Sequence, residues 1–327
     1  SRMAGGGKVL LGVLGLASAA YFRILSPKLV GGVGVIGAGL VALLVAYQEK
    51  ILYIPEIQGI KTPRQNPQGY QSPDQQGLVY EEVWMTTPDG VKLHGWFIPS
   101  PTEPAMSPTL LFCHENAGNI GLRIDEFKAL HGRLKANQFV FDYRGYGFSS
   151  GEPSQDGLVT DAVTALHWLQ TRADEGKIDG QKLVLTGRSL GGAVAIHLAE
   201  KVDQLGLRHP PKALIVENSF TSISDMVDEK FPILNVPFFK DYFLRLKWDS
   251  LSIVPRLALP ILFLSSIHDE IVPAKQMQQL KTAATSASDV EFHSFSATHN
   301  DIWLRGQAPY WNAKKNFVYK VTGPPTK

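Results

Sequence analysis

Residues 183–193 read LVLTGRSLGGA, and this short stretch decides the fold. Its first four residues are apolar or β-branched and predict a buried strand, whereas the residues from Leu190 onward favour a helix. Between strand and helix stands the pattern G-x-S-x-G, from Gly187 to Gly191, which in this setting is typical of a nucleophile elbow. Such a turn needs small residues because a side chain would strike the neighbouring strand or helix. We therefore predict Ser189 as a nucleophile; taken alone, the pattern would also suit a turn without function.

The rest of the chain alternates short apolar segments with helical patterns. The segments that predict buried strands are 109–113, 139–143, 183–186, 213–217, 261–265 and 291–295. The helical patterns between them lie at 121–135, 156–173, 190–202 and 274–284. This alternation indicates an α/β fold with a mostly parallel sheet covered by helices on both faces. Two further strands, 81–86 and 92–98, are joined across Pro88-Asp89-Gly90 and predict an antiparallel hairpin at one edge.

An acid and a histidine follow the serine in the order that the chemistry requires. A serine hydroxyl needs a base beside it to act as a nucleophile, and folds built around a nucleophile elbow supply the acid first and the histidine second. Asp269 follows a predicted strand, with Glu270 as the alternative acid, and His299 follows the last predicted strand. We therefore predict a triad of Ser189, Asp269 and His299, and we interpret the neighbouring His268 as structural.

The stretch CHENAGN, residues 113–119, ends another predicted strand at the place of an oxyanion-hole loop. One backbone N–H donor should come from Leu190, directly after the nucleophile, and we expect the second from Asn116. Such donors are each worth on the order of a hundred- to a thousandfold in rate. Glu115 puts a charge directly before the second donor, which raises the question of whether it alters the oxyanion hole.

Three nearby features are interpreted as structural. Cys113 ends a buried strand and is predicted to be a core residue, and His114 is predicted to hold its loop by hydrogen bonds. The glycine-rich stretch 142–151, DYRGYGFSSG, has neither the G-x-G-x-x-G spacing nor the following lysine of a phosphate-binding loop. No two of the nine histidines have H-x-x-x-H spacing, so we predict neither a metal nor a cofactor.

The N-terminal region predicts a membrane anchor. Residues 29–47 contain no charge and no proline, and at about 1.5 Å per residue they span roughly 28 Å, close to the thickness of a hydrocarbon core. The alternatives for this segment are a buried helix of a soluble domain and a cleaved signal peptide. An earlier apolar run at 9–25, interrupted only by Arg23, suits a second span, an interfacial helix or a signal-peptide core. We expect a single-pass protein of an intracellular membrane or the plasma membrane.

Composition changes along the chain predict three regions. These are a membrane anchor at 1–50, a polar connector rich in Pro, Gly and Gln at 51–77, and a catalytic domain at 78–327. Within the last region, residues 221–254 interrupt the alternation of strands and helices and are rich in aromatic residues and proline. We predict that this insertion is a short lid over the site.

Bulk composition limits the possible partners. The formal net charge of +2 gives no reason to expect nucleic acid as a partner. A single cysteine excludes an intrachain disulfide and therefore a disulfide-built secreted scaffold. A hydrophobic content of 44% and a charged content of 19% are enough for a large core and argue against a disordered chain.

Several longer stretches match a known family. They are YQEKILYIPE (47–56), NPQGYQSP (66–73), HENAGN (114–119), DYRGYGFSSGEPS (142–154), GRSLGGAVA (187–195), ENSFTSISDMV (217–227), WDS (248–250) and HDEIVP (268–273). By these stretches the chain resembles the α/β-hydrolase domain-containing protein 13 group, the bud-emergence-type membrane hydrolases. The resemblance implies an α/β-hydrolase fold, one N-terminal span and a Ser-Asp-His triad, which maps onto Ser189, Asp269 and His299. Glu115 departs from the family, which usually has glycine there.

These features lead us to expect a membrane-anchored serine hydrolase that cleaves acyl esters or thioesters through an acyl-serine intermediate. A hydrophobic acyl-ester or S-acyl substrate at a lipid membrane would suit the predicted anchor and the aromatic lid. Protein depalmitoylation and lipid ester hydrolysis both fit, and better-studied proteins related to the family look like depalmitoylases. A serine peptidase of the same fold and a non-catalytic scaffold are the alternatives.

Overall fold

The computed structural model describes residues 39, 42–231, 240 and 242–325. Contacts between residues divide the chain into two compact units, Ser1–Gln48 and Glu49–Lys327. The second unit contains all the predicted site residues. Most of the predicted membrane span at 29–47 lies outside the described residues. Within the described residues, no helix is long and apolar enough to cross a membrane.

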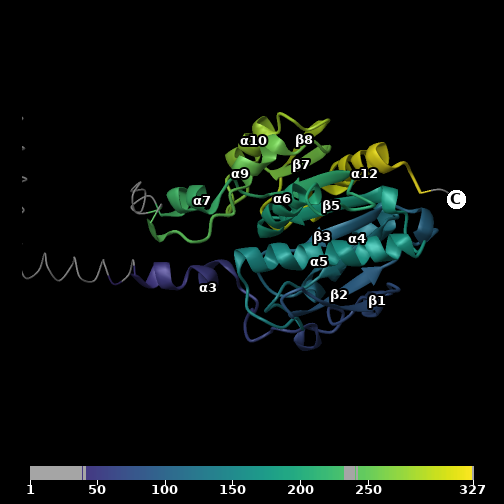
Figure 1. The fold of residues 1–327 in the computed structure, drawn as a ribbon, viewed down its shortest axis with the longest axis horizontal. Coiled ribbons are helices and arrows are strands. Elements are labelled where there is room, and N and C mark those ends of the chain that lie inside the picture. Colours follow the sequence, from purple (N-terminus) through teal and green to yellow (C-terminus); the bar gives the residue numbers. More distant parts are fainter. Residues whose placement is uncertain (1–38, 40–41, 232–239, 241, 326–327) are drawn as a thin grey trace, which may run out of the picture. The chain divides into compact units, whose positions relative to one another are not determined.

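The second unit is built on one eight-stranded sheet, which Figure 1 shows with helices packed along it. Its strands are β1 (Glu81–Thr86), β2 (Lys92–Ile98), β3 (Thr109–Cys113), β4 (Asn137–Phe141), β5 (Leu183–Arg188), β6 (Ala213–Glu217), β7 (Ile261–Ser266) and β8 (Val290–Phe295). They lie in the order β1-β2-β4-β3-β5-β6-β7-β8. The pairs β1–β2 and β2–β4 are antiparallel and all the others are parallel. The predicted α/β sheet with an antiparallel edge is therefore confirmed.

Helices cover both faces of the sheet. The α-helices of the described residues are α3 (Gln48–Leu52), α4 (Ile124–Leu134), α5 (Gln155–Asp174), α6 (Leu190–Val202), α7 (Ile223–Lys230), α9 (Ser250–Ile253), α10 (Ala274–Ala283), α11 (Ile302–Arg305) and α12 (Gln307–Thr322), and neither α3 nor α7 has a buried residue. One core cluster joins α5, α6 and α10 to the sheet, and a second joins α4 and α12 to it. Central strands such as β5 and β6 are buried along their whole length, as their unbroken apolar pattern predicts.

The predicted connector belongs by its contacts to the same compact unit as the sheet. It contains two short 3-10 helices, Pro63–Gln65 and Pro73–Gln76. The buried side chains of Asn66 and Asn119 exchange hydrogen bonds of 2.8 and 3.0 Å. A polar composition is compatible with this packing because the buried amide groups satisfy one another.

The insertion predicted as a lid lies between β6 and β7. Its described parts include α7 and α9, and residues 232–239 and 241 lie outside the described residues. Trp248 of this insertion is fully buried, and its Nε1 donates to the hydroxyl of Tyr53 at 3.0 Å. The insertion is thus packed against the segment that follows α3.

Candidate active site

Ser189 occupies a strained turn between β5 and α6. Its backbone has φ 54° and ψ −123°, a region that residues with a side chain rarely adopt and that tends to occur at functional sites. Two hydrogen bonds hold this conformation: the Ser189 N–H donates to the Glu217 carbonyl at 2.9 Å, and the Ser219 hydroxyl donates to the Ser189 carbonyl at 2.9 Å. The predicted strand–turn–helix geometry is present.

The glycines on both sides of the turn are required by contact distances. A Cβ on Gly187 would lie 2.0 Å from the Gly191 carbonyl oxygen, and a Cβ on Gly191 would lie 2.0 Å from the Cys113 carbonyl oxygen. Both obstacles are backbone atoms, so no side-chain movement could relieve the clash. The G-x-S-x-G pattern is therefore a packing requirement of this turn.

Asp269 and His299 are in direct contact. The Nδ1 of His299 donates to Asp269 Oδ2 at 2.7 Å, and the two side chains are only 3% and 2% exposed, respectively. The other oxygen of Asp269 accepts the N–H groups of Ile271 at 2.9 Å and Val272 at 2.7 Å. Because these bonds leave the carboxylate little freedom, they orient the imidazole with Nδ1 toward the acid.

Neither competing residue occupies the position of Asp269. Glu270 accepts a hydrogen bond from the backbone N–H of His299 at 3.1 Å, and no hydrogen bond joins it to the imidazole within the described residues. His268 is exposed, and its backbone N–H donates to the Ala297 carbonyl at 3.1 Å. The loop therefore aims one acid, Asp269, at the histidine.

Asn218 connects the histidine loop to the nucleophile elbow. Its Nδ2 donates to the His299 carbonyl at 2.9 Å, and the residue before it, Glu217, accepts the Ser189 N–H. Asn218 itself has a positive φ of 43°. Within the described residues, the Ser189 hydroxyl and His299 Nε2 are not hydrogen-bonded to each other; such bonds are often long before substrate binds.

The two predicted oxyanion donors follow neighbouring parallel strands, Asn116 after β3 and Leu190 after β5. Leu190 is the first residue of α6, where N–H groups have no acceptor in the helix and the helix dipole is positive. Asn116 is held by its carbonyl, which accepts the Ile54 N–H at 2.9 Å and the Tyr146 hydroxyl at 2.8 Å. Within the described residues, neither the Asn116 N–H nor the Leu190 N–H has a hydrogen-bond acceptor, so both are free to bind an anion.

His114 holds the predicted oxyanion loop by hydrogen bonds, as expected. Its Nδ1 donates to the Glu115 carbonyl at 2.6 Å, and its Nε2 accepts the Tyr143 N–H at 3.3 Å. One donor and one acceptor define a neutral imidazole. Burial, together with the nearby Arg123, lowers the pKa of His114 to about 3. Cys113 is a core residue, and burial raises the pKa of its thiol to about 12.

Glu115 is turned toward two arginines. It forms ion pairs with Arg123 and with Nη1 of Arg188, the latter at 2.9 Å. Burial alone would raise the pKa of Glu115, but the two guanidinium groups outweigh it and hold the pKa well below its usual range. The residue is therefore a charged partner of the arginines beneath the loop.

A buried group of charges beside the elbow was missed by the sequence analysis. We name it the Arg188 cluster, and it consists of Arg188, Glu115, Glu126, Glu217 and Lys314. All five residues are buried. The signals were a charged residue inside G-x-S-x-G and a glutamate ending an apolar strand, but only the fold shows that they meet.

The glycine-rich stretch 142–151 is a structural turn, as predicted. Arg144 forms ion pairs with Asp161 at 2.8 Å and with Asp89 at 2.7 Å. The buried Asp142 accepts the Ile120 N–H at 2.9 Å. The turn therefore ties β4 to the hairpin and to α5.

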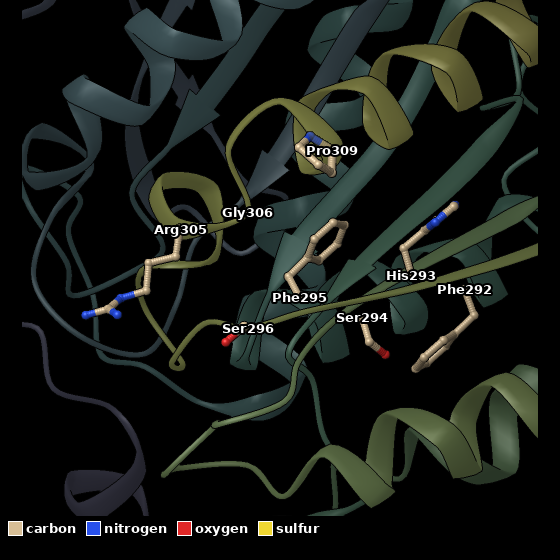
Figure 2. Close-up of a pocket in the computed structure, with 8 residues that line it drawn as sticks. All are labelled: Phe292, His293, Ser294, Phe295, Ser296, Arg305, Gly306 and Pro309. Atoms are coloured by element: carbon tan, nitrogen blue, oxygen red, sulfur yellow. The ribbon is translucent and has the colours of Figure 1, made fainter.

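A surface pocket of about 540 Å³ lies along β8. Figure 2 shows Phe295 on the side of β8 toward Pro309, with Phe292 directed to the opposite side and Arg305 at the other end of the pocket. None of the predicted site residues lines this pocket. Within the described residues, no group of His, Cys, Asp or Glu side chains could hold a metal ion.

Comparisons with known proteins agree with this architecture. A protein-family model described as alpha/beta hydrolase fold matches residues 152–247. The esterase Pf2001 of Pyrococcus furiosus superposes with a TM-score of 0.62 at 18% identity, covering 77% of this chain and 96% of that one. The carboxylesterase EstE1 superposes with a TM-score of 0.59 at 18% identity, covering 75% of this chain and 90% of that one. The elbow and the sheet thus define an α/β-hydrolase-fold protein.

Relatives with similar sequences define the family more narrowly. The alpha/beta hydrolase domain-containing protein WAV2 of Arabidopsis thaliana is 39% identical, with 88% of this chain and 92% of the relative covered. The protein bem46 of Schizosaccharomyces pombe is 37% identical, with 89% and 92% covered. The uncharacterized membrane protein YNL320W of Saccharomyces cerevisiae is 33% identical, with 90% and 96% covered. The chain belongs to the α/β-hydrolase domain-containing proteins of the bud-emergence type.

Proposed function

We propose that this protein is a serine hydrolase that cleaves acyl esters or thioesters through an acyl-serine intermediate. The observation that carries the proposal is the buried 2.7 Å contact between His299 and Asp269, joined through Asn218 to the elbow that presents Ser189. An imidazole oriented by a carboxylate beside an elbow serine is the arrangement used for acyl transfer on this fold.

The proposed reaction has two halves. In the first, His299 Nε2 takes the proton of the Ser189 hydroxyl as its oxygen attacks the acyl carbon, and the N–H groups of Asn116 and Leu190 bind the oxyanion. His299 then gives this proton to the leaving alcohol or thiol, which leaves an acyl-serine. In the second, His299 takes a proton from water, the hydroxide attacks the acyl carbon, and the proton returns to Ser189 as the acid departs. Asp269 stabilises the imidazolium in both halves.

Exposed apolar side chains around the site support a hydrophobic acyl substrate. We name this group the apolar rim, and it consists of Ile51, Ile54, Phe231, Ile267 and Ile271. Ile54 pairs with Ala117 of the oxyanion loop, and Lys230 of α7 donates to the Glu270 carbonyl at 2.9 Å. Its members therefore come from segments that border the carboxyl ends of the parallel strands, where sites in this kind of sheet lie. Exposed apolar side chains near a site are a feature of surfaces that bind lipid or apolar ligands.

A membrane location fits the same proposal. The uncharged stretch 29–47 suits a single span, and one relative is named a membrane protein. A site beside a bilayer would meet acyl chains on lipids and on S-acylated proteins. We therefore propose hydrolysis of lipid esters or of S-acyl groups on proteins as the activity.

Hydrolysis of acyl esters and thioesters of increasing chain length tests this proposal. The full-length protein in detergent or nanodiscs should cleave long-chain substrates with a higher kcat/KM than acetyl or butyryl ones. Ile267→Asp should reduce the long-chain activity and leave the short-chain activity nearly unchanged, with Met106→Asp, at an exposed site before β3, as the matched control. A clear preference for short soluble esters would contradict the hydrophobic substrate, and absence of any hydrolysis would contradict the enzyme.

A further inference from the structure

The two segments that carry the proposed oxyanion donors continue beyond the last hydrogen-bonded residue pair of the sheet. The last pair of the β3–β5 ladder is Cys113 with Gly187. Both proposed donors, Asn116 and Leu190, lie three residues beyond that pair, where no strand hydrogen bonds set their separation. An oxyanion hole works only if both N–H groups lie about 2.7–3.1 Å from the same oxygen.

A buried ion pair continues the link beyond the ladder. Arg188 directly precedes Ser189, Glu115 directly precedes Asn116, and Nη1 of Arg188 donates to Glu115 Oε1 at 2.9 Å. Arg188 is 2% exposed and Glu115 is 8% exposed. Water therefore screens this pair little, and the attraction is stronger and more directional than at the surface.

Arg123 fastens the other oxygen of Glu115 to the oxyanion loop. Its Nε donates to Glu115 Oε2, its Nη1 to the Asn119 carbonyl at 2.7 Å, and its Nη2 to the Ala117 carbonyl at 2.7 Å. One guanidinium thus holds three points of the loop. Glu115 therefore connects this loop to Arg188, the residue before the proposed nucleophile.

We propose that Glu115 is a positioning residue that, through Arg188 and Arg123, sets the distance between the oxyanion donors Asn116 and Leu190. The inference rests on the proposed function. The charge of Glu115 also matters, because a carboxylate one residue from an oxyanion donor would repel the negative charge that develops on the substrate oxygen. The two arginines neutralise that carboxylate.

The test compares Glu115→Gln with Glu126→Gln in the full-length protein. Glu126 is the matched control because it is a buried carboxylate paired with the same arginine through Nη2, yet within the described residues it forms no hydrogen bond to the oxyanion loop. For Glu115→Gln we expect kcat on a soluble short-chain ester to fall by about 10- to 100-fold, the order expected for misplacing a donor. KM should stay within about twofold, since the ground-state ester depends little on the hole.

Affinity for a trifluoromethyl ketone separates positioning from folding. This ketone forms a tetrahedral oxyanion on the serine, so its Ki should rise in Glu115→Gln by the same factor by which kcat/KM falls, while Glu126→Gln changes the melting temperature but neither kcat nor Ki. A folded Glu115→Gln enzyme with unchanged kcat and Ki would overturn the inference and leave Glu115 with a structural role.

A second variant covers the case in which Glu115→Gln does not fold. Arg123→Lys keeps the charge at a side chain that is 11% exposed, but a single ammonium cannot hold the carboxylate and both carbonyls at once. It should show the same matched change in kcat and Ki, and normal values would overturn the inference. If Ser189→Ala is inactive but Glu115→Gln has normal kcat and Ki, this inference is wrong and the proposed function stands. If Ser189→Ala keeps full activity, the proposed function itself is wrong.

Discussion

Ser189 and Arg188 are neighbours in the chain but lie in two different kinds of charged environment. On the side of the serine, one carboxylate and one imidazole meet through a single 2.7 Å hydrogen bond. On the side of the arginine, three buried carboxylates surround one guanidinium, with Lys314 adding a second cation. A proton can move in the first environment because the imidazole can accept a proton at one ring nitrogen while the other donates to the carboxylate. In the second, opposite charges hold one another fixed.

The difference indicates a division of labour around the elbow. The Asp269–His299 pair should control the reaction and contribute little to folding, whereas the Arg188 cluster should control folding and touch the reaction only through Glu115. Burial would raise the pKa of Glu217, but Lys314 and Arg188 outweigh it and keep the pKa lowered. Burial raises the pKa of Glu126 despite the nearby Arg188. The ionised state of the glutamates in the cluster therefore depends on the cations beside them.

The largest expected effect comes from removing the charge of Asp269. In Asp269→Asn the imidazole would lose its oriented, charged acceptor, and we expect kcat to fall by about 10⁴-fold, as for the corresponding change in a well-studied serine protease. Steady-state ester hydrolysis measures this, and the melting temperature should change by only a few degrees. Glu270→Gln is the control and should retain most of the activity. If kcat falls more in Glu270→Gln than in Asp269→Asn, then Glu270 and not Asp269 is the acid of the triad.

A smaller effect, on stability, is expected from Lys314→Met. Lys314 is fully buried and ion-paired with Glu217, and breaking a buried pair from one side costs about 3–5 kcal/mol. Urea denaturation should show this loss, while kcat per folded molecule stays close to that of the wild type. Lys320→Met on the same helix removes an exposed lysine paired with Asp289 at 2.6 Å and should barely move the midpoint. Equal effects of the two variants would contradict the structural role of the cluster.

The smallest effect concerns the pH dependence of stability through His114. Because the folded pKa is about 3 and the unfolded one is about 6.5, the unfolded chain takes up the proton first as pH falls. Stability from this group is therefore complete above about pH 6.5 and decreases toward about pH 3, by about 2 kcal/mol between pH 7 and pH 5. Urea denaturation at these two pH values should show a smaller difference for His114→Gln, with His167→Gln at an exposed site as control. An unchanged difference in His114→Gln would show that His114 is not the group responsible.

Local patterns in the sequence were enough to predict the sheet and the elbow. Strands such as β5 and β6 are unbroken apolar runs, and the glycines of the elbow are required by backbone contacts that any sequence with this turn must avoid. The start of β4 was placed two residues late, because Asn137 and Gln138 are polar yet buried. Asn137 satisfies its amide by bonds to Thr109 and to the Ser100 N–H, which an apolar pattern does not reveal.

Contacts between distant residues were beyond such patterns. Arg188 meets Glu115 across 73 positions, and Lys314 meets Glu217 across 97. A single charged residue in a strand or helix carries no mark of its partner, so the Arg188 cluster could not be predicted. The contact of Asp269 with His299 was predictable only because chain order in this fold limits where the acid and the base can lie.

Ser189 is the proposed nucleophile, and the site of covalent labelling tests this role most directly. The full-length protein is treated with a fluorophosphonate, digested and analysed by mass spectrometry for the modified residue. We predict one adduct on Ser189, no adduct in Ser189→Ala, and much slower labelling in Asp269→Asn. An adduct on the adjacent Ser219, or labelling that persists unchanged in Ser189→Ala, would contradict the account.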